Sequence, residues 1–208
     1  MFWQVICVLI LGISLVVLFW VITRNASARI VAQFRSMAER FDVELTEPPA
    51  QLGGFIRPEP FLHGVYRGCE FSISVPGKGL QNTRQIETLL KVQVPNTTAD
   101  LQMAPASTMS RLARREKGKK RVWKSGDPDF DTALTVYSST PESLELILDV
   151  DARESFLKLL KGSKATIYMG KGVLTFAEFG LIANDSKREV FERALETFCD
   201  FAESLDES

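Results

Sequence analysis

An uninterrupted apolar segment opens the chain and limits what it can fold into. No charged side chain occurs before Arg24. As an α-helix rising about 1.5 Å per residue, residues 2–22 measure roughly 32 Å, enough to cross a hydrocarbon core of about 30 Å. The fifteen Val, Ile, Leu and Phe residues of this stretch favour insertion by on the order of 6 kcal/mol. We therefore predict a transmembrane helix over residues 1–24.

Side chains that act as membrane anchors flank this segment. Trp3 and Trp20 lie near its two ends, where indole rings prefer the level of the lipid headgroups, and Arg24 follows directly. No basic residue precedes the segment, whereas four arginines follow it before residue 41. The positive-inside rule then predicts a single-pass protein of the inner (cytoplasmic) membrane, with its N-terminus outside and its C-terminal domain in the cytoplasm.

A cleaved signal peptide is the alternative to an anchor. Ala26-Ser27-Ala28 has the small-x-small pattern of a cleavage site. However, the segment lacks a basic n-region, and its apolar run exceeds the roughly 7–15 residues of a signal-peptide core. These features favour an uncleaved anchor.

Composition points to an ordinary globular domain beyond the anchor. The chain has 208 residues, a formal net charge of −1 and 25% charged residues, values that suit one domain and do not point to a polyanion-binding protein. Cys7, Cys69 and Cys199 have no spacing typical of a disulfide framework or a metal site. We expect them to be reduced, free thiols.

The residues after the anchor divide into three predicted parts. Residues 25–44 carry apolar side chains at intervals of three and four, which predicts an amphipathic juxtamembrane helix that packs on its own domain or docks on a partner subunit. Pro48-Pro49 and Gly53-Gly54 predict a linker over 45–60. The soluble domain is expected over 61–208.

Alternating strands and periodic helices set the expected fold class. The predicted strands are 61–66, 69–75, 83–94, 101–103, 133–137, 164–169 and 173–179, and the predicted helices are 141–148, about 149–160 and 185–205. Because hairpins dominate, we predict an α+β fold, in which the N-terminal transmembrane helix precedes a two-layer domain of antiparallel sheet with helices on one face.

A basic segment lies between two of the predicted strands. Its basic residues are Arg111, Arg114, Arg115, Lys117, Lys119, Lys120, Arg121 and Lys124. Such a cluster near a membrane can bind anionic lipid or an acidic protein surface, or remain a solvated loop. Nucleic acid is a weaker alternative, because Trp123 is the one aromatic residue at hand for base stacking.

Three aspartates follow, spaced as Asp127-x-Asp129-x-Asp131 like the opening of a calcium-binding loop. The sixth position is Thr132 rather than glycine, and the twelfth is Ser138 rather than glutamate. We predict a structural turn whose carboxylates accept backbone N–H bonds and whose Phe130 packs into the core. A weak metal site at this turn is the alternative.

No pattern of catalytic residues is present in the sequence. The single histidine, His63, leaves no material for a catalytic triad or a multi-histidine metal site. The apolar segment has no imidazole or carboxylate for a cofactor or a proton path. We therefore predict no cofactor and no enzymatic activity, with a carboxylate-based active site as the remaining enzymatic alternative.

The stretch Gly126-Asp127-Pro128-Asp129-Phe130-Asp131 and the leucine-rich helix around Arg153 resemble a set of uncharacterised bacterial proteins. In these proteins a short N-terminal span precedes a soluble domain with a GD-x-x-FD turn, a glycine-centred hairpin and a final helix. The resemblance covers about residues 60–205 and implies a bacterial membrane protein with this layout. It implies no activity.

The sequence thus favours a non-catalytic, single-span accessory or scaffolding subunit of a larger membrane complex, with an energy-transducing (respiratory or photosynthetic) host as one possibility. Its expected partners are the lipid bilayer and other integral membrane subunits. The alternatives are a membrane-surface adaptor or sensor that binds anionic lipid or a soluble partner, and an enzyme with a carboxylate site.

Overall fold

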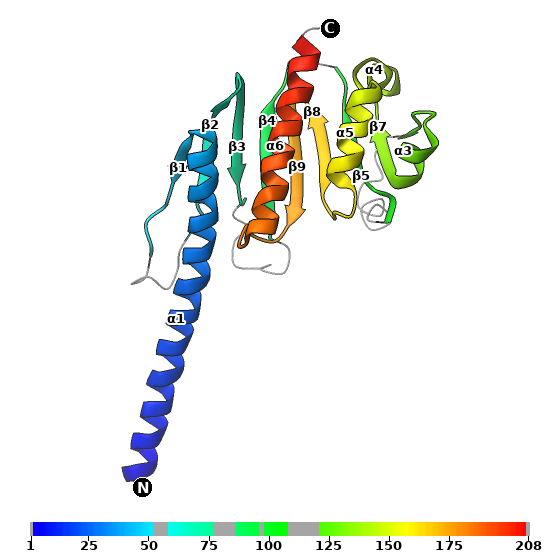
Figure 1. The fold of residues 1–208 in the computed structure, drawn as a ribbon. Coiled ribbons are helices and arrows are strands. Elements are labelled where there is room, and N and C mark those ends of the chain that lie inside the picture. The colour runs from blue at the N-terminus through cyan, green and yellow to red at the C-terminus, as the bar shows by residue number, and fades with distance from the viewer. Residues whose placement is uncertain (1, 52–57, 77–85, 96–97, 108–120, 207–208) are drawn as a thin grey trace.

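The computed structural model describes residues 2–51, 58–76, 86–95, 98–107 and 121–206. One long helix, α1 (Phe2–Phe41), projects from an α+β domain, and its first half makes no contact that buries it (Figure 1). Of the helices described, α1 alone is long and apolar enough to cross a membrane. The α+β class and the long apolar N-terminal helix confirm the prediction.

All the described strands belong to a single antiparallel sheet. They are β1 (Glu44–Thr46), β2 (Phe61–Tyr66), β3 (Cys69–Ser74), β4 (Glu87–Gln93), β5 (Leu101–Pro105), β6 (Arg121–Trp123), β7 (Leu134–Ser138), β8 (Thr166–Gly170) and β9 (Val173–Phe179). Their order across the sheet is β1-β2-β3-β4-β9-β8-β5-β7-β6. Hairpins build most of it, and β9 joins the two halves by pairing with both β4 and β8.

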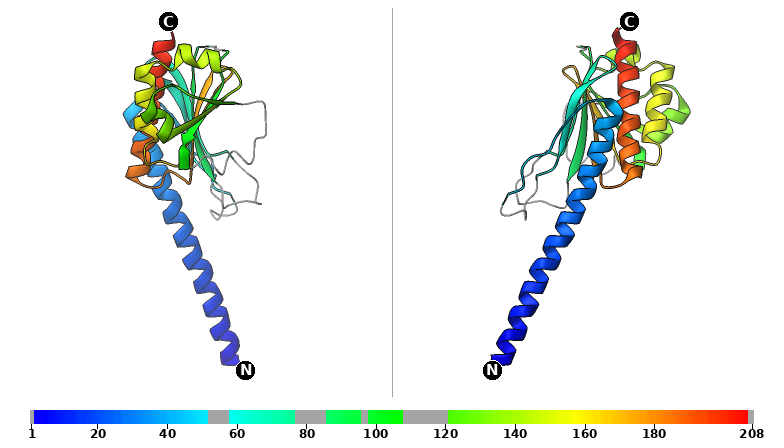
Figure 2. Two further views of the ribbon diagram at one scale, coloured as in Figure 1. Left: turned by 90° about the vertical axis from the view of Figure 1, so that its right-hand side faces the viewer. Right: turned by 60° about the vertical axis from the view of Figure 1, so that its left-hand side comes forward.

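The helices form a second layer on one face of this sheet (Figure 2). Besides α1 they are α3 (Pro128–Ala133), α4 (Pro141–Ile147), α5 (Val150–Leu160) and α6 (Asp185–Asp206). Alternate residues of each central strand point into the layer between sheet and helices, as the burial pattern of β3 shows. Phe176 of β9 packs edge to face on Phe191 and Phe198 of α6, so the core centres beneath α6.

The chain runs back and forth between two ends of the domain. We call the end beside the projecting half of α1 the anchor end, and the opposite end, near the C-terminus, the far end (Figure 1). The loops that follow β1, β9 and α5 lie at the anchor end. The β2–β3 turn and α4 lie at the far end.

Several boundaries differ from the sequence prediction. The predicted transmembrane and juxtamembrane helices are one continuous helix that ends at Phe41, where Asp42 takes a positive φ of 53°. β1 lies at the edge of the predicted domain linker, and β6 lies in the predicted basic loop. Both strands have three residues, too few to show an alternating pattern without knowledge of their partners.

The N-terminal caps of α4 and α6 are formed in different ways. Thr140 occupies the N-cap position of α4 but makes no capping bond, because its hydroxyl is directed to Asp100 instead. Asn184 caps α6: its Oδ1 accepts from the Lys187 N–H at 2.9 Å.

A close approach between β2 and Val43, in the connection from α1 to β1, makes Gly64 sensitive to substitution. A methyl group at Gly64 would lie 2.6 Å from Val43 Cγ1 and 2.8 Å from Val43 Cβ. We expect Gly64→Ala to lower the free energy of unfolding by about 1–3 kcal/mol through overpacking, measured by chemical denaturation in detergent micelles.

Gly170→Ala is the matched control, since a methyl group there meets nothing within 4 Å. Adding Val43→Ala to Gly64→Ala should restore most of the loss. A Gly64→Ala protein as stable as the Gly170→Ala protein would contradict this packing.

Candidate functional site

The junction between α1 and the domain is the most elaborate feature of the described structure. The last third of α1 enters the core, and its buried residues repeat at intervals of three and four: Ile30, Phe34, Met37, Ala38 and Phe41. The ring of Phe41 packs edge to face on Tyr66, with centroids 4.8 Å apart. The same helix therefore carries, at its N-terminal end, an apolar surface long enough to cross a hydrocarbon core, and at its C-terminal end a stripe of side chains buried in the domain.

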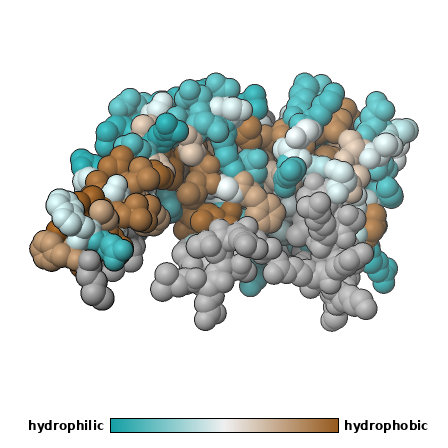
Figure 3. Space-filling model, turned by 90° about the horizontal axis from the view of Figure 1, so that it is seen from below, coloured by the Kyte–Doolittle hydropathy of each residue, from teal (hydrophilic) through white to brown (hydrophobic). Residues whose placement is uncertain are grey.

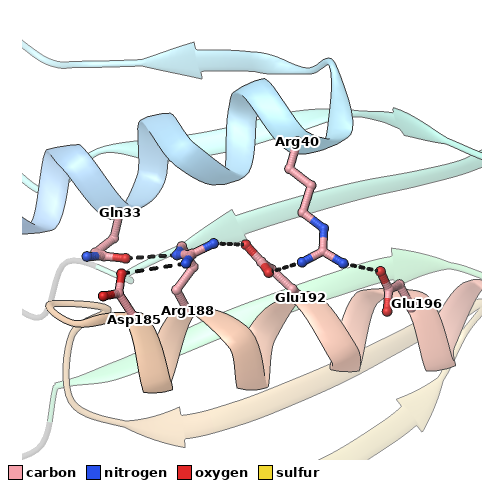
Figure 4. A network of polar contacts seen from close by, with 6 residues as sticks. All are labelled: Gln33, Arg40, Asp185, Arg188, Glu192 and Glu196. Carbon is pink, nitrogen blue, oxygen red and sulfur yellow. Dashed lines mark hydrogen bonds and ion pairs between the residues drawn. The ribbon is translucent and has the colours of Figure 1, made fainter.

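A chain of charged groups runs between α1 and α6 alongside this apolar contact (Figure 4). Glu192 of α6 is its centre, with only 1% of the side chain exposed. Arg40 of α1 donates to one carboxylate oxygen of Glu192, and Arg188 donates to the other at 2.7 Å. Arg40 also donates to Glu196 at 2.8 Å.

Arg188 extends the network toward the anchor end. Its Nε donates to the Gln33 side-chain oxygen of α1 at 3.0 Å, and its Nη2 lies 3.5 Å from the Asp185 carboxylate. Burial acts to lower the pKa of the Arg188 guanidinium, but its hydrogen bond and ion pair with Glu192 outweigh this effect and raise the pKa above its ordinary value. The network thus contacts α1 at two places seven residues apart, Gln33 and Arg40, or about 10 Å along the helix.

Two contacts so spaced fix both the rotation and the axial position of α1 on α6. A buried ion pair does not need to add net stability to act in this way, since the desolvation cost offsets much of the attraction. Its directional bonds nevertheless penalise every other register, because a shifted α1 would take Arg40 away and leave the buried Glu192 carboxylate with Arg188 of its own helix alone.

A second polar contact holds the β2–β3 turn against the far end of α6. Arg67 adopts a positive φ of 50° and its guanidinium bonds both Asp200 and Glu203 at 2.7 Å. The hydrogen bond that Arg67 donates to Asp200 is the main reason that the pKa of the Arg67 guanidinium is raised above its ordinary value. Gly68 (φ 82°) completes this two-residue turn, as hairpin turns require.

Cys69 and Cys199 meet just below this turn. Both thiols are buried and free. The Cys69 thiol donates to the backbone oxygen of Cys199, and the Cys199 thiol donates to the backbone oxygen of Tyr66. Burial, followed by the neighbouring Cys69, strongly raises the pKa of the Cys199 thiol. A protonated, enclosed thiol is a poor nucleophile, so these cysteines serve as packing groups.

A small cavity lies at the anchor end of the junction. Its volume is about 40 Å³, close to that of a single water molecule, and its walls come from α1 and from the segments that flank residues 52–57. The lining residues are Ser27, Val31, Glu47, Pro48, Ala50, Pro58 and Pro60. Arg35 bonds Glu47 at 2.7 Å and thereby holds this segment beside α1.

Glu178 and Lys187 form a half-buried pair of groups near the start of α6. Burial raises the pKa of Glu178 above its ordinary value of 4.5 and lowers that of Lys187 below 10.5, and each charge partly opposes the other's shift. The Lys187 ammonium donates to the backbone oxygen of Phe179. One carboxylate oxygen of Glu178 is buried without a hydrogen-bond partner among the described atoms.

The predicted membrane-anchor residues lie on the projecting half of α1. Trp3 is 78% exposed near its tip. The Arg24 guanidinium stacks over the Trp20 ring, 5.1 Å from its centroid. A guanidinium and an indole together at one end of an apolar helix suit the interface between hydrocarbon and headgroups.

The predicted contact segment for lipid or protein falls mostly outside the described residues. The basic residues that lie outside the described ranges are Arg111, Arg114, Arg115, Lys117, Lys119 and Lys120. Arg121 begins β6 with an exposed side chain. Lys124 is exposed, and its ammonium lies 3.4 Å from the backbone oxygen of Asp131.

The aspartates of the GD-x-x-FD stretch are occupied by backbone groups. Asp127 is the N-cap of α3 and accepts from the N–H groups of Asp129 and Phe130. Asp131 accepts from the N–H groups of Ser125 and Gly126. Burial acts to raise the pKa of Asp131, but these bonds outweigh it and lower the pKa below 3.8. Phe130 is buried against Trp123.

A further polar cluster escaped the sequence prediction. Oδ1 of Asp100 accepts from the hydroxyls of Ser138, Ser139 and Thr140 and from the Ser139 N–H. These bonds join the start of β5 to the end of β7. Within the described chain, no group of three or more His, Cys, Asp or Glu side chains is arranged to hold a metal ion.

Comparison with known proteins gives one fold-level likeness. No family model matches the sequence, and no curated protein matches it. Among solved structures, the crystal structure of the mycobacterial trehalose monomycolate transport factor A, TtfA, is similar with a TM-score of 0.55 and 11% identity. The match covers 86% of this chain and 94% of that one, so at this identity the two proteins share an overall fold.

The junction network generates a stability prediction. Glu192→Gln keeps the side-chain volume but leaves Arg40 and Arg188 without their shared counter-charge. Because the two arginine side chains are 48% and 19% exposed, we expect a loss of about 1–3 kcal/mol of unfolding free energy, less than for a fully buried pair.

Glu47→Gln is the matched control, since its pair with Arg35 is exposed on both sides, and it should change stability by less than about 0.5 kcal/mol. Equal losses of unfolding free energy for the two substitutions in urea titrations would contradict the structural role assigned to Glu192.

The raised pKa of Glu178 generates a pH prediction. Above pH 4.5 the Glu178 carboxyl releases its proton in the unfolded chain but still holds it in the folded chain. Its contribution to stability is therefore full at low pH and declines as the pH rises from the unfolded-state pKa through the higher folded-state pKa. The unfolding free energy of the wild type, relative to Glu178→Gln, should therefore fall as the pH rises above 4.5.

Asp131→Asn is the control of opposite sign, because a lowered pKa stabilises the fold above 3.8 and this contribution is lost as pH falls. A difference between wild type and Glu178→Gln that rises with pH would contradict the assignment.

Proposed function

We propose that this protein is a non-catalytic, single-span accessory or scaffolding subunit of a membrane protein complex. The observation that carries the proposal is α1 itself, because its apolar half is fully exposed while its last third is built into the core. An exposed apolar surface of this length requires lipid or other membrane helices. The domain then serves as a docking body held at the membrane surface.

The continuity of α1 also supports an uncleaved anchor. The helix passes through Ala26-Ser27-Ala28 without a break, and the buried stripe begins at Ile30. The arginines after the span support a cytoplasmic domain and an N-terminus outside. The structurally similar TtfA is a transport factor, which fits an accessory role in a membrane process.

The outer faces of the domain suit contacts with other proteins. Seen from the anchor end, hydrophilic residues cover the outer surface of the helix layer, and the projecting helix is hydrophobic (Figure 3). We propose integral membrane subunits as the partners of the span. An adaptor or sensor that recruits partners through the Arg111–Lys124 segment is the second candidate, favoured by the charge of that segment.

Two substitutions at the middle of the span test the anchor. An arginine at the centre of a transmembrane helix costs roughly 3 kcal/mol, so Leu11→Arg with Leu15→Arg offsets the favourable insertion estimated above. The wild type should remain in carbonate-washed membranes, whereas the double variant should be released. The control, Leu11→Ala with Leu15→Ala, should remain with the membrane.

Purification of the tagged full chain in mild detergent tests the accessory role. Stoichiometric co-purification of an integral membrane protein, lost in the double arginine variant and kept in the double alanine variant, is the expected result. A monodisperse monomer from native membranes would refute the accessory role while leaving the anchor intact.

A further inference from the structure

The exposed charges of the domain are divided between its two ends. The far end, farthest from the projecting helix, carries many exposed or half-exposed carboxylates (Figure 1). They are Asp42, Glu142, Glu145, Asp149, Asp151, Asp200, Glu203 and Asp206. Arg67 offsets part of this charge through its pairs with Asp200 and Glu203.

The anchor end has the opposite balance. Arg29 of α1 and Lys161 and Lys164 of the α5–β8 loop are exposed there, and none forms an ion pair within the described part of the chain. The acidic residues of this end are mostly neutralised: Glu47 pairs with Arg35, and Asp185 lies within an ion-pair distance of Arg188.

Burial reduces the remaining negative charge at this end. It raises the pKa of both Glu59 and Glu178, which favours their neutral forms. Two carboxylates remain: Glu87, half-buried at the start of β4, and Glu189, exposed on the second turn of α6; they are fewer than the three basic side chains. The net result is a basic anchor end and an acidic far end, which is the polarity that an anionic membrane surface attracts.

The length of α1 determines how close the anchor end comes to the bilayer. Ile30, the first residue of the buried stripe, lies six positions after Arg24, the first charge. At about 1.5 Å per residue this is roughly 9 Å, comparable to the 5–8 Å thickness of one headgroup layer. Because α1 is unbroken and the Glu192 network fixes its register, the domain begins at headgroup level.

An exposed apolar side chain accompanies the basic residues. Phe179 ends β9 at the anchor end and is 48% exposed. Its neighbour Gly180 donates to Ile86, which holds this corner in place. Aromatic and basic side chains on one surface suit the boundary between headgroups and acyl chains.

We propose that the anchor end of the domain is a lipid-contact surface that binds anionic phospholipid headgroups through Arg29, Lys161 and Lys164, with Phe179 beside them. This inference rests on the proposed function in one respect, since it requires α1 to span the bilayer. The contact would orient the domain, so that the acidic far end points away from the membrane and is free for a partner.

Lysine acetylation of the full chain in nanodiscs tests the proposal. One set of discs contains phosphatidylcholine alone, and the other contains phosphatidylcholine mixed with phosphatidylglycerol. We expect Lys161 and Lys164 to react roughly threefold more slowly in the anionic discs at moderate salt, as read by mass spectrometry. Lys171, in the β8–β9 turn of the far end, is the internal control and should react equally in both.

A charge-reversal variant separates contact from simple enclosure. Lys161→Glu should return the acetylation rate of Lys164 in anionic discs to the rate in neutral discs, because the local positive charge is lost. Lys171→Glu, the matched control, should leave the protection of Lys164 intact. High salt should also abolish the difference between the two kinds of disc.

Three results would overturn the proposal. Equal reaction rates in both kinds of disc, with the protein still co-eluting with the discs, would refute the lipid contact and leave the anchor standing. Equal protection in both, relative to detergent micelles, would refute the preference for anionic headgroups. Failure of the chain to remain with either disc would refute the anchor and the contact together.

Discussion

The placement of one buried carboxylate governs how this protein meets the membrane. Glu192 is nearly inaccessible to solvent and is shared between Arg40 of α1 and Arg188 of its own helix. A charge so placed favours one register of α1, because any other takes Arg40 away and leaves one of its oxygens buried without its partner. The apolar half of α1 is therefore a rigid extension of the domain, and its direction is set by contacts made inside the fold.

The antiparallel sheet determines which residues lie at the end of the domain beside the apolar half of α1. Consecutive strands reverse direction, so connections alternate between the anchor end and the far end, and each end gathers residues distant in sequence. The connections that follow β1 and β9 come to one end in this way, and the β2–β3 and β8–β9 turns come to the other. The charge difference between the ends is thus a property of topology, invisible in a net charge of −1.

Sequence patterns revealed the elements whose periodicity is local. The span, α6 and the β8–β9 hairpin were found from apolar repeats and turn residues, and with them the α+β class. β1 and β6 were missed because three-residue strands are defined by their partners, and Ala133 ends α3 where a strand was expected. The network escaped because Arg40 and Glu192 are 152 residues apart, although the i, i+4 spacing of Arg188, Glu192 and Glu196 was visible.

The two halves of α1 have different surroundings. Substitutions in the apolar half therefore affect where the protein is located, whereas substitutions in the other half affect its folding. The side chains of the apolar half make no burying contact with the domain, so their replacement by other apolar residues leaves the core unchanged. Phe34 and Met37, by contrast, are fully enclosed and belong to the same core as Phe191. Between them, the stretch from Arg24 to Arg29 touches neither core nor hydrocarbon interior. If α1 spans a bilayer as proposed, the length of this stretch sets the height of the domain above it, and inserting or removing helical residues there would shift the domain by about 1.5 Å and turn it by about 100° for each residue.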